Sequence, residues 1–192
     1  MNSLNEEINR MISESADIIL KSKTISEQIE QAINQIVNCL KNGNKIIIFG
    51  NGGSAADAQH IAAELIGRFQ MERNSLPAIS LTTDSSIITS LGNDYSFDII
   101  FSRQCESMVT KNDIVIGIST SGNSKNVENG IISSKKKGAK TIGLLGKNGG
   151  SIKKSVDLAI QIPSENTARI QEGHRVIYHI ICDNVEKKMC GS

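Results

Sequence analysis

Apolar side chains follow a helical period through the N-terminal part of the chain. In the stretch SEQIEQAINQIVNCLKNGN, residues 26–44, they recur three and four positions apart, and Gly43 follows in a position typical of a helix end. The preceding stretch carries a second apolar stripe, formed by Leu4, Ile8, Met11, Ile12, Ile18 and Ile19. We therefore predict N-terminal helices over about residues 2–42. The stripe on the first helix either packs on a second subunit or caps its own domain.

A different pattern begins at Lys45. Five short apolar runs rich in β-branched residues alternate with segments of helical or connecting character; they read KIIIFG, PAISLTT, DIVIGIST, TIGLLG and DLAIQIP. Runs of this kind are typical of a parallel sheet that is buried on both faces. The alternation predicts an α/β fold, a three-layer α/β/α sandwich with a five-stranded parallel sheet over about residues 44–189. In such folds ligands bind beyond the carboxyl ends of the strands, where the strand order reverses.

The composition favours one domain and removes several classes of function. A chain of 192 residues suits one domain and is too short for two ordinary ones, so we expect residues 1–192 to form a single domain. The 21 basic and 20 acidic residues leave a net charge of +1, which gives no general electrostatic reason to bind nucleic acid or a membrane surface. Aromatic residues make up only 3% of the chain and tryptophan is absent, so there is no platform on which single-stranded nucleic acid would stack.

The expected location is the cytoplasm. The N-terminal segment lacks the basic region and the continuous apolar region of a secretory signal, and no apolar run is long enough to span a bilayer. The four cysteines, Cys39, Cys105, Cys182 and Cys190, form no C-x-x-C pair. This spacing favours reduced, buried thiols over a disulfide framework or a thiolate metal site.

Two loops are suited to holding an anion. The first is GNGGS, residues 50–54, and the second is STSGNS, residues 119–124; each follows a predicted strand and precedes a predicted helix. Backbone N–H groups and a helix N-terminus then point at a bound anion. The second loop adds four hydroxyl groups within six residues, on Ser119, Thr120, Ser121 and Ser124, which favours a phosphate.

The first loop has two other interpretations. Ser54 and Asp57 match a capping box, so the turn can simply start a helix. The residues GNGGSA also match the dinucleotide pattern G-x-G-x-x-A, which requires an acidic residue about 20 positions later at the end of the second strand. Glu72 precedes that strand and Asp84 lies too far along, so we expect no nucleotide cofactor.

The predicted helix after the first loop places His60 and Glu64 four residues apart, on one face. This pair can bind a metal, act as an acid and a base, or form a surface ion pair. The other two histidines, His174 and His179, lie in the terminal segment TARIQEGHRVIYHIICDNVEKK. His179 is near the edge of the apolar side of that helix, where the alternative is a histidine that is hydrogen-bonded within the core.

Taken together, the motifs GNGGSAADAQH, AQHIAAEL, LGNDYSF, GISTSGNS and ARIQEGHRVIYH resemble the phosphoheptose isomerases, and the resemblance extends from the N-terminal helices to about Glu186. It implies the sugar isomerase (SIS) fold and the conversion of D-sedoheptulose 7-phosphate into D-glycero-D-manno-heptose 7-phosphate. That reaction is the first step toward ADP- or GDP-heptose precursors of lipopolysaccharide or capsule. The resemblance also implies a homotetramer with sites at subunit boundaries.

The resemblance assigns roles to particular residues. Glu64 and His179 would be the acid and base that transfer protons through an enediol intermediate. One Zn²⁺ per subunit would be bound by His60, Glu64, Gln171 and His179. The sugar phosphate would contact two sets of residues. The sugar would meet Asn51, Gly52, Gly53, Asn93 and Asp94, together with Glu64 and Gln171, and the phosphate would meet Ser119, Thr120, Ser121 and Ser124.

Two points stay open in the sequence. Gln171 and His179 are eight residues apart, about 12 Å along an ideal helix, so a shared ion requires both side chains to lean inward or the helix to deviate near Gly173. The alternative function is a catalytically inactive SIS-domain protein that binds and regulates a replication initiator. The presence of both Glu64 and His179 favours the enzyme.

Overall fold

The apolar runs that begin at Lys45 form one parallel sheet. The computed structural model of the chain describes residues 3–191; the expected helix start at residue 2 and the expected domain limits at residues 1 and 192 lie outside them. The strands are β1 (Ile46–Gly50), β2 (Ala78–Ser80), β3 (Ile114–Ser119), β4 (Lys140–Leu145) and β5 (Leu158–Gln161). Their order is β2-β1-β3-β4-β5, and every neighbouring pair is parallel. The predicted sheet is therefore confirmed.

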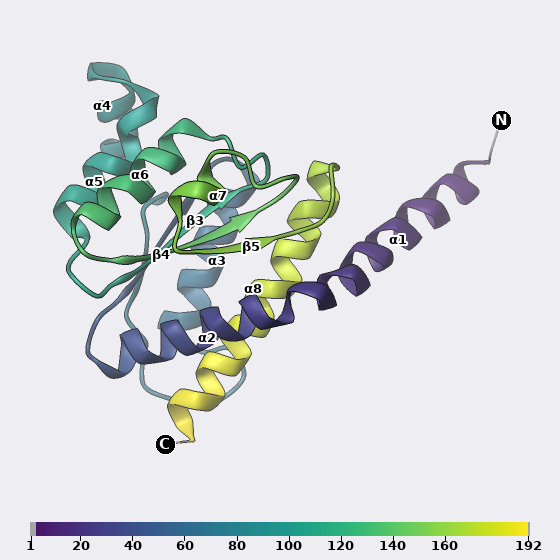
Figure 1. Cartoon of the computed structure of the whole chain (residues 1–192), viewed down its shortest axis with the longest axis horizontal. Coiled ribbons are helices and arrows are strands. Elements are labelled where there is room, and N and C mark those ends of the chain that lie inside the picture. Colours follow the sequence, from purple (N-terminus) through teal and green to yellow (C-terminus); the bar gives the residue numbers. More distant parts are fainter. Residues whose placement is uncertain (1–2, 192) are drawn as a thin grey trace.

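Helices cover both faces of this sheet (Figure 1). One face packs on α2 (Ser26–Lys41), α3 (Gly53–Ile66) and α8 (Thr167–Cys190), and the other packs on α5 (Ile100–Met108), α6 (Lys125–Lys136) and α7 (Ile152–Ser155). The alternation of side chains along β1 explains the two cores, since Ile46 and Ile48 join the first and Ile47 and Phe49 join the second. The remaining elements are α1 (Leu4–Lys21), η1 (Ser22–Ile25), α4 (Ser85–Asp94) and η2 (Phe97–Ile99).

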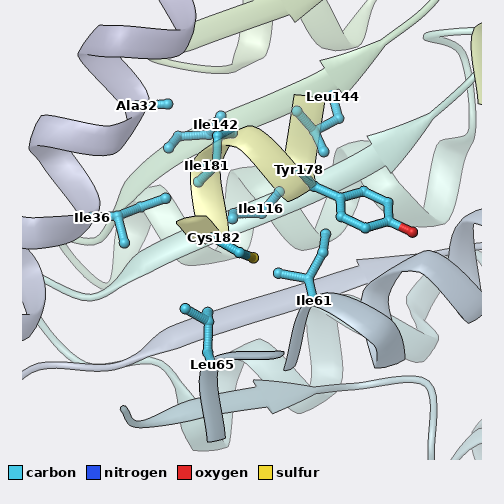
Figure 2. Close-up of a pocket in the computed structure, with 10 residues that line it drawn as sticks. All are labelled: Ala32, Ile36, Ile61, Leu65, Ile116, Ile142, Leu144, Tyr178, Ile181 and Cys182. Carbon is cyan, nitrogen blue, oxygen red and sulfur yellow. The ribbon is translucent and has the colours of Figure 1, made fainter. Parts of the chain in front are cut away.

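The core between the sheet and α8 is closely filled. Figure 2 shows side chains of α2, α3 and α8 meeting those of β3 and β4, and the space left between them is only about 10 Å³. The Tyr178 ring lies at the margin of this cluster, and its hydroxyl points away from the apolar side chains. A tyrosine in this position places a polar group beside the core without burying it unpaired.

Burial on both faces holds for the three inner strands and fails at the edges. Every residue of β1 and β3 is buried, whereas Ile79 in the middle of β2 is 36% exposed and alternate residues of β5 are only partly buried. β2 and β5 are the edge strands, so each has a neighbouring strand on one side only. Edge strands such as these are commonly short and are less completely covered than the inner strands.

Helix α1 extends beyond the rest of the molecule (Figure 1). Its apolar stripe is present, yet no residue of α1 is buried by the part of the chain that the structure describes. It is tied to α8 by Arg169, which donates a hydrogen bond of 2.6 Å to the carbonyl oxygen of Met11. The stripe was expected either to pack on a second subunit or to cap its own domain, and the second role accounts poorly for a stripe that the chain leaves unburied. Within residues 3–191, no helix combines the length and the apolar character needed to cross a membrane.

Candidate active site

The two predicted anion loops meet where the strand order reverses. β1 and β3 are neighbours in the sheet although β2 lies between them in the chain, so the loops after β1 and β3 flank the switch point. Gly50 closes the first strand, and a Cβ there would lie 2.9 Å from the carbonyl oxygen of Ile118. The Asn51 side chain then exchanges two hydrogen bonds, of 2.8 and 2.9 Å, with Asn126 on α6. This amide pair joins the first loop to the helix that follows the second.

The capping-box interpretation of the first loop is wrong. The N-cap of α3 is Gly52, with φ of 56°, and it makes no side-chain capping bond. Because the helix starts at Gly53, Ser54 already lies in its first turn. Asp57, which is 2% exposed, reaches α8 instead, where Arg175 donates a hydrogen bond of 3.1 Å to its carboxylate.

The hydroxyl groups of the second loop converge. Ser119 Oγ lies 2.9 Å from Ser124 Oγ and 3.4 Å from Ser121 Oγ, and it accepts a hydrogen bond of 3.1 Å from the Gly122 N–H. Ser124 is the N-cap of α6 but makes no side-chain capping bond to that helix. Thr120 lies between these serines in the same turn. The loop therefore presents clustered hydroxyls at a helix N-terminus, as the phosphate prediction requires.

A third loop supports the second, and sequence reasoning treated it only as a short connection. It is GKNGGS, residues 146–151, after β4. A Cβ on Gly122, whose φ is 68°, would lie 2.2 Å from the carbonyl oxygen of Gly149. The Ile152 N–H donates to the Gly122 carbonyl at 3.0 Å, and the Ser151 N–H donates to Asn123 Oδ1 at 3.0 Å. The signal was present as a glycine pair after a buried strand, like that of the first loop.

The ionisable cluster lies on α3 and α8. His60, Glu64 and His179 are each partly buried, and one ligand atom from each lies within 4.8 Å of the others. His60 Nε2 is 2.8 Å from Glu64 Oε1, and the two imidazole rings stand edge to face with centroids 5.1 Å apart. Two imidazoles and one carboxylate form a donor set that zinc accepts.

Tyr178 connects this cluster to Asp57. Its hydroxyl donates to Asp57 Oδ1 at 3.3 Å, accepts from Arg175 Nε at 3.1 Å and lies 3.2 Å from His60 Nδ1. Burial, and next the charge of Asp57, raise the pKa of Tyr178 to about 12, so the phenol stays protonated at neutral pH. Sequence reasoning missed Asp57, Arg175 and Tyr178 because their positions in the chain give no sign that they meet beside His60.

The surroundings of His179 affect its protonation. Its burial, followed by the positive charge that His60 can carry, lowers the pKa of His179 below its ordinary value. The imidazole is therefore neutral at neutral pH, with a lone pair available to a proton or a metal ion. His174 is fully buried, donates from Nε2 to the carbonyl oxygen of Leu145 at 3.0 Å, and has a pKa lowered by burial. Its contacts are those of a core residue.

Some predicted site residues lie away from this cluster. The Gln171 side chain lies over Gly53 at the start of α3, where a Cβ on that glycine would be 2.4 Å from Gln171 Nε2. Glu64 is eleven residues beyond Gly53, about 16 Å along an ideal helix. Asn93 and Asp94 are exposed at the end of α4 and hydrogen-bond to each other at 2.8 Å. Figure 1 shows α4 at the upper left, apart from α8, which runs through the middle of the view to the C-terminus.

Known proteins share both the sequence and the fold. A family model described as SIS domain matches residues 10–146. The phosphoheptose isomerase of Geobacter sulfurreducens is 52% identical over 167 residues, which cover 87% of this chain and 88% of that protein. Among solved structures, the phosphoheptose isomerase of Neisseria gonorrhoeae matches with a TM-score of 0.91 and 39% identity, over 96% of this chain and 100% of that one. A phosphoheptose isomerase from Francisella tularensis matches with a TM-score of 0.93 and 37% identity, over 97% and 100%.

Proposed function

The chain belongs to the SIS-domain family and, within it, to the phosphoheptose isomerases, and from this premise we propose that it converts D-sedoheptulose 7-phosphate into D-glycero-D-manno-heptose 7-phosphate. The observation that carries the proposal is the 52% identity with a phosphoheptose isomerase over 87% of the chain. The clustered serine hydroxyls at the switch point and the His60, Glu64, His179 cluster give that identity a chemical basis.

The second loop, residues 119–124, is called the serine loop below, and in this proposal it binds the phosphate. We infer that a phosphate group accepts hydrogen bonds from the hydroxyls of Ser119, Thr120, Ser121 and Ser124 and from backbone N–H groups at the start of α6. Asn51, Gly52 and Gly53 allow the sugar to approach the main chain beside that loop. This remote contact fixes the reacting carbons of the substrate, which reduces the entropic part of the barrier.

Glu64 and His179 transfer the protons. Glu64 takes a proton from C1 of the ketose while His179 gives a proton to the C2 oxygen, which produces the 1,2-enediol. Glu64 then returns its proton to C2, and His179 takes the proton of the O1 hydroxyl as C1 becomes the aldehyde. No proton is lost or gained overall, and no redox cofactor is required. The neutral imidazole favoured by the lowered pKa of His179 suits this exchange.

His60, Glu64 and His179 also fit one Zn²⁺ ion, because their ligand atoms lie within 4.8 Å of one another and are of the types that zinc prefers. When bound, zinc would polarise the substrate carbonyl and organise the pocket. Gln171, the fourth predicted ligand, lies over Gly53 at the start of α3 in this chain.

The complete site needs more than one subunit. Asn93 and Asp94 are exposed at the end of α4, a helix that lies apart from α8 in the same chain (Figure 1), yet the prediction places them against the sugar. A homotetramer with sites at subunit boundaries brings residues of different copies together, and the unburied stripe of α1 supplies a surface for such contacts. In this proposal the enzyme works in the cytoplasm and its product enters heptose precursor synthesis for lipopolysaccharide or capsule.

Incubation of the purified protein with D-sedoheptulose 7-phosphate tests the activity. We expect aldoheptose 7-phosphate to form, detected by NMR of the anomeric protons, and we expect added EDTA to slow the reaction if zinc takes part. Absence of product with and without added Zn²⁺ would remove the proposal. It would also favour the alternative, a catalytically inactive SIS-domain protein that regulates a replication initiator.

A further inference from the structure

Glu186 is a buried carboxylate that the proposed reaction does not use. It lies on α8, and the residue is 1% exposed. Its two oxygens accept hydrogen bonds from the backbone N–H groups of Phe69, Gln70 and Met71, at 2.9, 2.7 and 2.8 Å. It also accepts one from Arg73 Nε at 2.9 Å. One carboxylate thus holds the start of the segment that leads from α3 to β2.

Arg73 connects the same carboxylate to the end of α3. Its guanidinium donates to the carbonyl oxygen of Glu64 at 2.8 Å and to that of Leu65 at 2.9 Å. These carbonyls belong to the last turn of the helix, where the helix itself supplies no further N–H and a cation is favourable. The Leu65 carbonyl also accepts a hydrogen bond of 3.1 Å from the Leu76 N–H. The planar fork of arginine makes these contacts and the contact with Glu186 at the same time. Arg73 therefore ties the turn that carries Glu64 to α8.

Phe69 extends the arrangement to His179. Its backbone N–H is held by Glu186, and its ring lies against the His179 ring with centroids 5.7 Å apart. His179 also contacts the His60 ring, with centroids 5.1 Å apart. The imidazole therefore packs against a residue that Glu186 holds and against a residue that α3 carries.

The charge state of the pair supports a rigid attachment. Burial alone would raise the pKa of Glu186, but the backbone N–H groups of residues 69–71 and the Arg73 guanidinium together hold that pKa below its ordinary value. The side chains are 5% and 1% exposed, so the pair is shielded from water and salt. Removing either charge leaves the other buried without its partner, which is costly.

We propose that Arg73 and Glu186 are positioning residues of the active site, which fix the end of α3 against α8 and so hold Glu64 and His179 at the separation that proton transfer needs. Neither residue touches the substrate in this scheme. Their effect passes through the Glu64 backbone and through Phe69. The inference rests on the proposed function for the roles of Glu64 and His179, whereas the geometry that it describes can be measured without turnover.

The test compares two buried carboxylates with similar contacts. Glu186→Gln removes the charge beside the site. Asp113→Asn is the matched control, because Asp113 is 0% exposed, accepts from Lys45 Nζ at 2.7 Å and from the Thr110 N–H at 2.7 Å, and lies at the amino ends of the strands, opposite the site. Both variants should lower the melting temperature. We expect only Glu186→Gln to lower kcat by about tenfold or more with KM within about twofold.

A spectroscopic measurement keeps the test independent of activity. In the intact protein labelled with ¹³C-histidine, the ring signals of His179 should shift in Glu186→Gln, because Phe69 moves relative to the imidazole, and should stay in place in Asp113→Asn. Arg73→Lys keeps the positive charge but loses the fork, and it should show the same two effects if Glu186→Gln does not fold. If both variants lower stability equally while kcat and the His179 signals of the site variant match the wild type, the proposal is wrong. If the wild-type protein does not turn over the ketose, the proposed function is wrong. The His179 signals would still test the positioning role, because they do not depend on turnover.

Discussion

Glu64 differs from the other acidic residues of the chain in what surrounds it. It shares a partly buried position with two imidazoles, whereas Glu106, for example, lies on an exposed face paired with Arg103. Glu64→Gln keeps the shape and a hydrogen-bonding oxygen but removes the base. We expect kcat to fall by about 10³-fold, within the usual range for a lost general base, while the sugar phosphate still binds.

Steady-state kinetics and calorimetric binding of the ketose phosphate measure these two effects separately. Glu106→Gln is the control and should keep normal activity. Near-normal turnover by Glu64→Gln would remove Glu64 as the base.

The serine loop makes a separate prediction at the same scale. Ser119 is 3% exposed and its hydroxyl lies 2.9 Å from Ser124 Oγ, so in the proposed function both hydroxyls are expected to contact the same phosphate group. Ser119→Ala should raise KM by about tenfold or more, the usual effect of losing a hydrogen bond to a charged group, and should change kcat less. Ser133→Ala removes a hydroxyl from the far end of α6, where it bonds to the carbonyl oxygen of Ser102, and should leave KM unchanged. An unaltered KM in both Ser119→Ala and Ser124→Ala would contradict the loop assignment.

Single residues show where sequence reasoning works and where it stops. The four hydroxyls of residues 119–124 are adjacent in the chain, so a predicted strand before them and a helix after them were enough to recognise the loop. Asn126 lies 75 residues from its partner Asn51, and Tyr178 lies 121 residues from Asp57. No local pattern predicts such pairs, because the folded sheet alone brings them together.

At the scale of elements, the site depends on the contact between the second and third loops. Gly122 has φ of 68° and its Cα faces the Gly149 carbonyl at a distance that leaves no space for a methyl group. Gly122→Ala should therefore destabilise the protein by more than the roughly 1–2 kcal/mol that the left-handed conformation costs an alanine, and should raise KM by moving the serine loop.

Gly43→Ala is a matched control for that change. Gly43 has a similar φ of 75°, but a Cβ there would meet nothing within 4 Å. This variant should lose only the stability that the left-handed conformation costs an alanine, and its KM should not change. Chemical denaturation and steady-state kinetics of Gly122→Ala and Gly43→Ala separate the backbone strain from the steric clash. Equal losses of stability in the two variants, together with an unchanged KM for Gly122→Ala, would show that the loop contact does not matter.

The elements themselves were predictable to different degrees. Inner strands were found because runs such as DIVIGIST are apolar on both faces, and the long terminal helix was found from its period. The start of α3 was misread, because a serine followed three residues later by an acid resembles a cap even where, as here, the helix begins two residues earlier. Helix α7 has four residues, Ile152–Ser155, which is too short for any period to show.

At the scale of the whole molecule, the fold places the candidate functional side chains at the carboxyl ends of the inner strands and on the neighbouring helices α3 and α8. The switch point between β1 and β3 holds the anion loops, while the ionisable cluster is fixed between α3 and α8. Residues that the sequence assigned to one site are therefore spread over three regions of a single chain. In the proposed homotetramer, the exposed apolar stripe of α1 is the surface expected to contact other copies.

The response of stability to acid follows from groups buried throughout the molecule. Burial lowers the pKa of both His174 and His179 below 6.5, so the unfolded chain binds protons on these residues while the folded chain does not. The unfolding free energy should therefore decrease as the pH falls below about 6.5, by roughly 1.4 kcal/mol per pH unit for each such histidine. Below about pH 4.5 a second loss begins, because the lowered pKa values of Glu186, Asp113 and Asp157 make their stabilising contributions disappear on protonation.

Urea denaturation between pH 7.5 and pH 5, at a fixed protein concentration so that any subunit association stays constant, measures the first part of this response. His174→Asn keeps a donor near the Leu145 carbonyl but cannot bind a proton, so it should be less stable at pH 7.5 and lose stability with a shallower slope. The slope should decrease by the contribution of one proton, since His179 is still present. Identical slopes in the wild type and His174→Asn would contradict the assignment of His174 as a buried, neutral imidazole.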